Sequence, residues 1–152
     1  MVRMALARNK KAFLNYEIMD TYEAGVSLAG FEVKSLKEGR GSLDGSFVSI
    51  RGGEAFLSGA HIPPHQPANA PKEYDSRRPR KLLLHKKELR ALAGAESMKG
   101  LTIIPISVYI KNNKVKVEIA VARGKKKYDK RETIKKKDAA RDVAREAKAR
   151  LR

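Results

Sequence analysis

The sequence predicts a mainly β protein, folded as a small closed barrel or sandwich of antiparallel strands, on three observations. Several short segments alternate apolar and polar residues, as half-buried strands do. Two pairs of these segments are joined by the two-residue connections Gly52-Gly53 and Asn112-Asn113, which suit tight hairpins. The segments with a helical pattern are few and short.

The first predicted elements are a strand over residues 15–28 and a short helix over residues 32–38. Gly25 lies inside the strand, where a glycine indicates a bulge or bend. Gly39 follows the helix, and glycine commonly ends a helix because it adopts the left-handed conformation without strain.

Two hairpins supply the other predicted strands, over residues 47–51 with 54–58 and over residues 101–110 with 114–122. In the last of these strands the apolar residues share one face and the polar residues share the other, which predicts a half-buried strand. The apolar face consists of Val115, Val117, Ile119 and Val121, and the polar face of Lys114, Lys116 and Glu118.

Between the hairpins lie a long loop over residues 63–79 and a helix predicted over residues 86–93, with Gly94 as its end. The loop holds five of the six prolines, and a loop of this length in a compact domain is often functional. We expect a polyanion to order it at the basic cluster formed by Arg77, Arg78, Arg80 and Lys81. The run Leu82-Leu83-Leu84 is expected to place at least two leucines in the core.

The 152 residues carry a formal net charge of +17, and the surplus is concentrated towards the C-terminus. Residues 123–152 hold fourteen Lys and Arg against five Asp and Glu, a net charge of +9. Residues 1–122 hold twenty against twelve, a net charge of +8. The sequence therefore predicts a basic domain over residues 1–122 and a more basic tail over residues 123–152. Nucleic acid is the commonest partner for such a charge, and among small barrels the oligonucleotide-binding type fits it best.

The tail is expected to be disordered in the free protein and to become helical over residues 133–151 on a partner. Its clustered positive charge opposes an isolated helix, and its apolar face is thin. Tyr128 stands among lysines, where its ring is suited to stack on an exposed base while the cations contact phosphates.

Several functional classes are excluded or lack support in the sequence. The chain has no cysteine, which excludes disulfides, cysteine-ligated metals and thiol catalysis. It has no apolar stretch of the ~18–20 residues that span a bilayer, and residues 1–11 lack the apolar region of a secretory signal, so we expect a cytoplasmic protein. It lacks a nucleophile elbow, a phosphate-binding glycine loop and an HExxH motif, and Pro63-Pro64 separates His61 from His65. We therefore expect no catalytic residue, no metal and no cofactor.

Three alternatives stay open at this point. An RNA-modifying or RNA-cleaving enzyme requires Glu23, Glu32 and Asp44 to converge on a metal ion. A protein held on anionic membranes by its tail requires a stronger apolar face than the tail offers. A generic basic RNA-binding or ribosome-associated β-barrel explains the charge alone, and on that reading Glu23 is a surface acid paired with a lysine.

Five segments in one order resemble the bacterial SsrA-binding protein family, also called small protein B. The resemblance covers about residues 7–132, and a basic tail of the expected length follows. Phe31 and Lys37 differ from the residues that are frequent at their positions in the family. The segments are ARNKKA (7–12), YEAG (22–25), GFEVKSL (30–36), RKLLLH (80–85) and GKKKYDKRE (124–132).

The resemblance implies an oligonucleotide-binding-type antiparallel β-barrel with flanking short helices and a basic C-terminal tail. It also implies a non-catalytic adaptor that binds the tRNA-like domain of transfer-messenger RNA and delivers it to stalled ribosomes for trans-translation. The implied partners are that RNA, the ribosome and, indirectly, elongation factor Tu. We expect the protein to act as a monomer.

The resemblance also assigns residues. The RNA-binding acid of the family falls on Glu23, its apolar contact on Leu83 and its strand lysine on Lys116, so Glu23 and Leu83 become expected contacts. The other expected RNA contacts are Asn9, Lys11, Lys34, Arg77, Arg78, Arg80 and Lys81. The segment expected to contact small-subunit rRNA at the decoding centre, with the tail beyond it in the vacant messenger path, comprises Gly124, Lys125, Lys126, Lys127, Tyr128, Asp129, Lys130 and Arg131.

Overall fold

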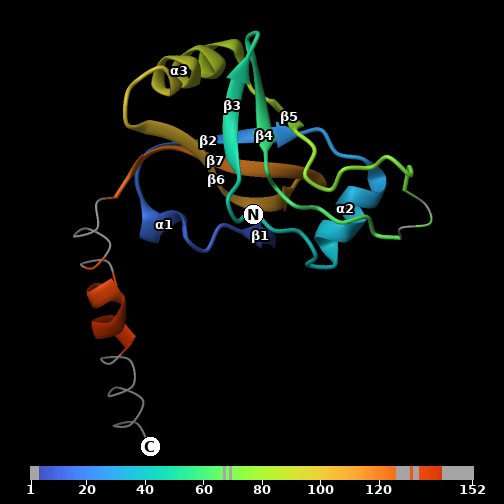
Figure 1. The fold of residues 1–152 in the computed structure, drawn as a ribbon, viewed down its shortest axis with the longest axis horizontal. Coiled ribbons are helices and arrows are strands. Elements are labelled where there is room, and N and C mark those ends of the chain that lie inside the picture. The colour runs from blue at the N-terminus through green and yellow to red at the C-terminus, as the bar shows by residue number, and fades with distance from the viewer. Residues whose placement is uncertain (1–3, 67, 69, 126–130, 132–133, 142–152) are drawn as a thin grey trace, which may run out of the picture.

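The computed structural model describes residues 4–66, 68, 70–125, 131 and 134–141. One antiparallel sheet of seven strands, in the order β1-β6-β3-β4-β5-β2-β7, closes into a ring because β6 also pairs with β7 (Figure 1). The predicted mainly β barrel with short flanking helices is confirmed. In chain order the elements are β1 (Met4–Arg8), α1 (Ala12–Asn15), β2 (Tyr16–Val26), α2 (Gly30–Lys37), β3 (Phe47–Arg51), β4 (Glu54–Ser58), β5 (Arg80–Leu83), α3 (Lys86–Glu96), β6 (Leu101–Lys111) and β7 (Lys114–Gly124).

Both predicted hairpins are present, and their turns explain why they form. Gly52 and Gly53 have φ angles of 57° and 76°, and Asn112 and Asn113 have φ angles of 52° and 59°. Two consecutive residues with positive φ give the turn whose twist matches antiparallel strands, and glycine and asparagine tolerate that conformation best.

Strand β6 joins the two sides of the ring. Its first half pairs with β3 at Ile103, and its second half pairs with β1, while β7 follows it along its whole length. Pro105 interrupts the ladder to β7, because proline has no N–H group, and the register shifts immediately after it. The Asn9 side chain donates a hydrogen bond to the Pro105 carbonyl at 2.9 Å, and the Asn9 backbone N–H donates to the Ile106 carbonyl at 2.8 Å. Asn9 therefore fixes the end of β1 to the irregular part of β6.

The interior of the ring contains one continuous apolar cluster. It contains Val48, Ala55, Leu57, Leu82, Ile103, Val117 and Ile119, and Leu92 of α3 packs against this cluster. A smaller cluster of Ala12, Ile104 and Ala122 lies beneath α1. The second half of β7 is therefore buried on both faces. Its first half is buried on one face only, as predicted: Val117 and Ile119 face the interior, and Lys116 lies on the opposite face.

Some boundaries and elements differ from the prediction. Strands β1 and β5 and helix α1 were not predicted. Helix α3 continues through the exposed Gly94 to Glu96, because a single exposed glycine costs only about 1 kcal/mol in a helix that is held by Leu92. The bulge in β2 lies between Ile18 and Asp20, and Gly25 instead marks the place where β2 pairs with two strands at once.

The described part of the tail is helical over residues 134–141, and all eight of these residues are exposed. The predicted change from disorder to helix on a partner stays a prediction, and most of the segment it concerns lies outside the described residues. Within the described residues, no helix has both the length and the apolar character needed to cross a membrane.

Candidate nucleic-acid interface

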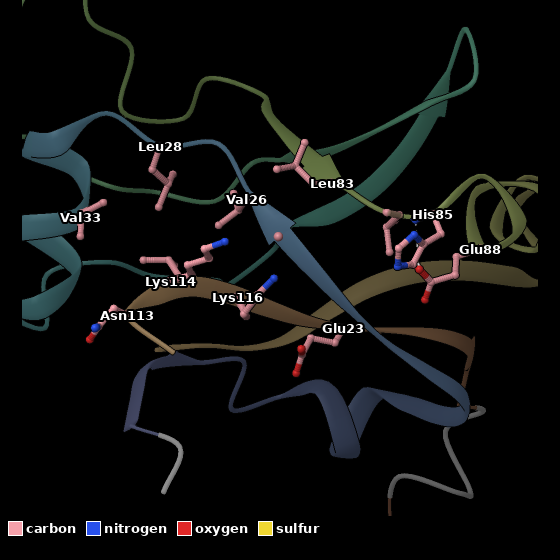
Figure 2. Close-up of a pocket in the computed structure, with 13 residues that line it drawn as sticks. Glu23, Val26, Leu28, Val33, Leu83, His85, Glu88, Asn113, Lys114 and Lys116 are labelled. Carbon is pink, nitrogen blue, oxygen red and sulfur yellow. Dashed lines mark hydrogen bonds between the residues drawn. The ribbon is translucent and has the colours of Figure 1, made fainter. Parts of the chain in front are cut away.

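An open groove on the outside of the barrel brings together the three residues that the family resemblance singles out. Glu23 comes from β2, Leu83 from β5 and Lys116 from β7, and all three line the groove (Figure 2). Its volume is about 620 Å³. Its other lining residues include Val26, Leu28, Val33, His85, Glu88 and Lys114.

The strand register explains this convergence. Gly25 pairs with Leu83 of β5 on one side and with Lys116 of β7 on the other. A Cβ atom at position 25 would lie 3.2 Å from the Leu83 Cβ, which is closer than side chains normally pack. The absence of a side chain at Gly25 therefore leaves room for Leu83 and opens the centre of the groove.

Glu23 is held in place by two groups from β6. The Tyr109 hydroxyl donates a hydrogen bond to Glu23 Oε2 at 2.5 Å, and Lys111 Nζ lies 3.3 Å from Glu23 Oε1. The Glu23 side chain is 32% exposed to solvent, whereas Tyr109 is only 2% exposed. A carboxylate that is fixed in direction and still reachable is suited to accept hydrogen bonds from a base edge or a ribose 2′-hydroxyl.

Tyr109 is a site residue that the sequence reasoning missed. Its phenol is almost fully buried, and a buried tyrosine hydroxyl normally finds a hydrogen-bond partner. A tyrosine inside an otherwise apolar predicted strand was the available signal, but only the order β6-β7-β2 places its hydroxyl at Glu23.

Leu83 is 57% exposed and stands on the outer face of β5. The expectation that at least two leucines of the run lie in the core is confirmed in part: Leu82 is fully buried, and Leu84 is partly buried and packs against the core cluster. Successive strand residues face opposite sides of the sheet, so Leu82 and Leu83 cannot both face the interior. An exposed leucine across Gly25 from Lys116 offers an apolar contact within a charged surface.

The predicted basic cluster is divided by the same alternation. Arg80 is 0% exposed, and its Nε and Nη2 donate to Glu32 Oε2 at 2.9 and 2.7 Å. Arg78 Nη2 donates to Glu32 Oε1 at 2.5 Å. The prediction that Arg80 contacts RNA is therefore corrected, since its guanidinium is enclosed in the protein. The buried Glu32 of α2 holds the end of the loop through Arg78 and Arg80, and the ordering of the loop by a polyanion stays a prediction.

Tyr74 completes this buried ion-pair cluster. Its hydroxyl lies 2.8 Å from Glu32 Oε2 and 2.6 Å from the Ile62 carbonyl, and its ring meets Phe31 edge to face at 4.8 Å. Burial alone would raise the pKa of Glu32, but hydrogen bonds from Arg78, the Ala29 N–H, Arg80 and Tyr74 together lower it. Burial, followed by the contact with Glu32, raises the pKa of Tyr74 to about 12. At neutral pH the carboxylate is therefore ionised and the phenol is neutral.

The remaining predicted RNA contacts lie outside the groove. Arg77 and Lys81 are exposed, and Lys81 Nζ pairs with Glu54 at 3.1 Å. Lys11 and Lys34 are exposed near α1 and on α2. Asn9 is partly buried and is engaged with β6. None of these five residues lines the groove.

The segment predicted to contact the decoding centre begins with two anchored residues. Gly124 ends β7 and pairs with Tyr16. The Lys125 backbone N–H donates to the Asn15 carbonyl at 2.8 Å, and Lys125 Nζ donates to the Phe13 carbonyl at 2.8 Å. Residues 126–130, which include Lys126, Lys127, Tyr128, Asp129 and Lys130, lie outside the described residues, and Arg131 is exposed. The tail therefore leaves the barrel next to α1.

The structure gives no support to the metal-dependent enzyme. Glu32, one of the three acids that it requires, is committed to Arg78 and Arg80. In the part of the chain that the structure describes, no group of three or more His, Cys, Asp or Glu residues is placed to hold a metal ion.

Comparisons with known proteins agree along the chain. A family model described as SmpB protein matches residues 6–149. A relative from Persephonella marina described as SsrA-binding protein is 51% identical over 147 residues, which cover 97% of this chain and 96% of the relative. A relative with the same description from Rubrobacter xylanophilus is 53% identical over 147 residues, covering 96% of this chain and 97% of the relative.

A solved structure described as "tmRNA-SmpB: a journey to the center of the bacterial ribosome" is similar in fold as well as in sequence. It matches with a TM-score of 0.67 and 42% identity, over 84% of this chain and 92% of that chain. The strand ring, the groove and these matches lead to one conclusion: the chain belongs to the SmpB protein family.

Proposed function

We propose that this chain binds the tRNA-like domain of transfer-messenger RNA and delivers that RNA to stalled ribosomes for trans-translation. The observation that carries the proposal is the convergence of Glu23, Leu83 and Lys116 in one groove of a protein from this family. Its relatives are described as SsrA-binding proteins, and the description of the similar solved structure names tmRNA-SmpB and the bacterial ribosome. The protein acts as a non-catalytic adaptor in the cytoplasm, as a monomer, with elongation factor Tu as an indirect partner.

Each groove residue has a distinct part in this proposal. Lys116 contacts a phosphate and supplies affinity that falls with salt. Leu83 packs against the apolar face of a base or sugar, since it is the large exposed apolar side chain of the groove. Glu23 accepts hydrogen bonds from a base edge or 2′-hydroxyl, and because this acid repels phosphates its contribution is to selectivity rather than to general RNA affinity.

The tail is proposed to act later, on the ribosome. The segment from Gly124 to Arg131 meets small-subunit rRNA at the decoding centre, and the residues beyond it follow the vacant messenger path. This part of the proposal is supported by the net charge of +9 over residues 123–152 and by the exposure of every residue in the described helix 134–141.

The proposal is tested by competition binding of the full chain to a transcript of the tRNA-like domain. An ordinary tRNA of similar length serves as competitor, at a fixed salt concentration, because affinity for RNA depends strongly on salt. A preference of at least tenfold for the tRNA-like domain is expected. Equal affinity for the two RNAs would contradict the proposal and leave a generic basic RNA-binding protein.

A further inference from the structure

The outer face of strands β3, β4 and β5 forms a second surface, beside the groove described above. Phe47, Ser49 and Arg51 alternate with the core-facing residues of β3, and Glu54, Phe56 and Ser58 alternate with those of β4. Cross-strand pairing sets Ser49 opposite Phe56, and Phe56 opposite Lys81 of β5. Two aromatic rings and a lysine therefore lie on adjacent strands of one open face.

This face has the features of a surface that binds a ligand. Phe47 is 47% exposed, although large apolar side chains normally turn inward in a sheet. Phe56 and Ser49 line an open depression of about 660 Å³ that reaches Pro79. The Ser49 hydroxyl is enclosed beneath this surface and has no hydrogen-bond partner within the described residues.

The charges on this face favour an anionic partner. Arg51 and Lys81 are exposed on it, and its acid is Glu54. The Lys81–Glu54 pair spans 3.1 Å, with side chains that are 47% and 49% exposed, and exposed pairs of this kind are worth little. A phosphate can therefore replace Glu54 as the partner of Lys81 at small cost.

We infer that this face binds unpaired RNA nucleotides, with bases stacked on Phe56 and Phe47 and phosphates held by Lys81 and Arg51. Phe47 and Phe56 are diagonal neighbours on the sheet, which places them about 7–8 Å apart. Rings at that separation each take a separate base, as on the aromatic platforms of single-strand-binding barrels. Apolar partner proteins fit this face poorly, because Phe47 is bordered by Ser49 and Ser58, and Phe56 is bordered by Ser49 and Lys81.

The face is continuous with the groove. Lys81 and Leu83 are two residues apart on β5 and share its outer side, and Leu83 also lines the groove beside Gly25. An RNA strand that leaves the groove at Leu83 passes onto Lys81 and then onto Phe56. The inference rests on the proposed function, since it extends the same RNA contact from the folded domain to an adjoining single strand.

The test uses the full chain and an unstructured RNA decamer at about 0.3 M salt, where binding by the basic tail alone is weakened. The decamer is expected to shift the amide NMR signals of β3, β4 and β5. Phe47→Leu and Phe56→Leu keep an apolar side chain at each position and remove the ring. Each is expected to weaken decamer binding by about tenfold, since stacking on one ring contributes about 1–3 kcal/mol. Lys81→Met should weaken binding and lower its salt dependence.

The controls separate this inference from the proposed function. Lys87→Met removes an exposed charge from α3 and is expected to leave decamer binding within twofold of the wild type. Glu23→Gln is expected to reduce selectivity for the tRNA-like domain without affecting the decamer. The inference is overturned if both phenylalanine variants bind the decamer like the wild type, or if the decamer shifts only signals of the tail. Neither result would bear on the preference for the tRNA-like domain over tRNA.

Discussion

Replacing Arg80 by methionine should destabilise the protein strongly, because Arg80 is the buried cation of the cluster around Glu32. The change removes five hydrogen bonds, two of them to Glu32 Oε2 and the others to the Ala60 and Ser76 carbonyls and the Tyr74 hydroxyl. Breaking a buried ion pair from one side costs about 3–5 kcal/mol. Arg78 still pairs with Glu32 Oε1, so we expect the lower end of this range, about 3 kcal/mol.

The free energy of unfolding is measured by urea denaturation followed by circular dichroism. A loss of about 3 kcal/mol corresponds to a fall in Tm of about 6–12 °C for a domain of this size. Lys81→Met is the matched control, because Lys81 is the next residue on the same strand and pairs with Glu54 on the exposed face. It should change stability by less than about 1 kcal/mol.

A double-mutant cycle identifies the cause. Glu32→Gln in the Arg80→Met background removes the buried charge that has lost its Arg80 partner, so the double variant should be at least about 1 kcal/mol more stable than the sum of the single changes predicts. The reasoning is refuted if Arg80→Met leaves the urea midpoint unchanged. It is also refuted if that variant loses RNA affinity at full stability, which is what a surface contact would do.

Three further predictions follow from named contacts. The wild type should lose stability as the pH rises through 10 towards 12, because the pKa of Tyr74 is raised from 10.0 to about 12 and the folded state favours the neutral phenol. Urea titrations at alkaline pH should show a smaller loss of stability in Tyr74→Phe. Gly25→Ala should weaken binding to the tRNA-like domain by about tenfold, since the new Cβ would lie 3.2 Å from the Leu83 Cβ and displace that side chain. Equal affinity of Gly25→Ala and the wild type in a filter-binding assay would show that Leu83 makes no contact with the RNA. Truncation before Gly124 should abolish tagging at stalled ribosomes in a reconstituted translation assay while binding to the free RNA persists, and normal tagging would exclude a role for the tail.

The hairpins were predictable because their signals are local. Gly52-Gly53 and Asn112-Asn113 adopt the positive φ angles that their turns require, and the alternation beside them fixes which face is buried. Strand β1 was missed because it is five residues long and its partner, β6, lies about a hundred residues later in the chain. No local pattern reports a pairing at that distance.

The site residues likewise divide into those that a local pattern predicts and those that depend on distant contacts. Strand alternation alone separates Arg80 from Lys81, but the burial of Arg80 depends on Glu32, which lies 48 residues earlier and arrives on α2. The sequence pattern by itself left Glu23 as a surface acid and Leu83 as a core residue, and the family resemblance made them contacts. What the structure adds is the reason they meet, which is that Gly25 pairs with β5 and β7 at one point.

The selectivity of Glu23→Gln tests the central claim most directly. The claim is that a fixed carboxylate in the groove, held by Tyr109 and Lys111, reads the tRNA-like domain. Affinities for that domain and for ordinary tRNA are measured for the wild type, for Glu23→Gln and for Glu17→Gln, which neutralises an exposed acid of the same strand. We predict that Glu23→Gln reduces the preference for the tRNA-like domain by about tenfold or more, since hydrogen bonds to a charged group contribute about 1.5–3 kcal/mol. The salt dependence of binding should stay nearly unchanged. A Glu23→Gln variant that binds both RNAs more tightly and discriminates between them as well as Glu17→Gln does would contradict the claim.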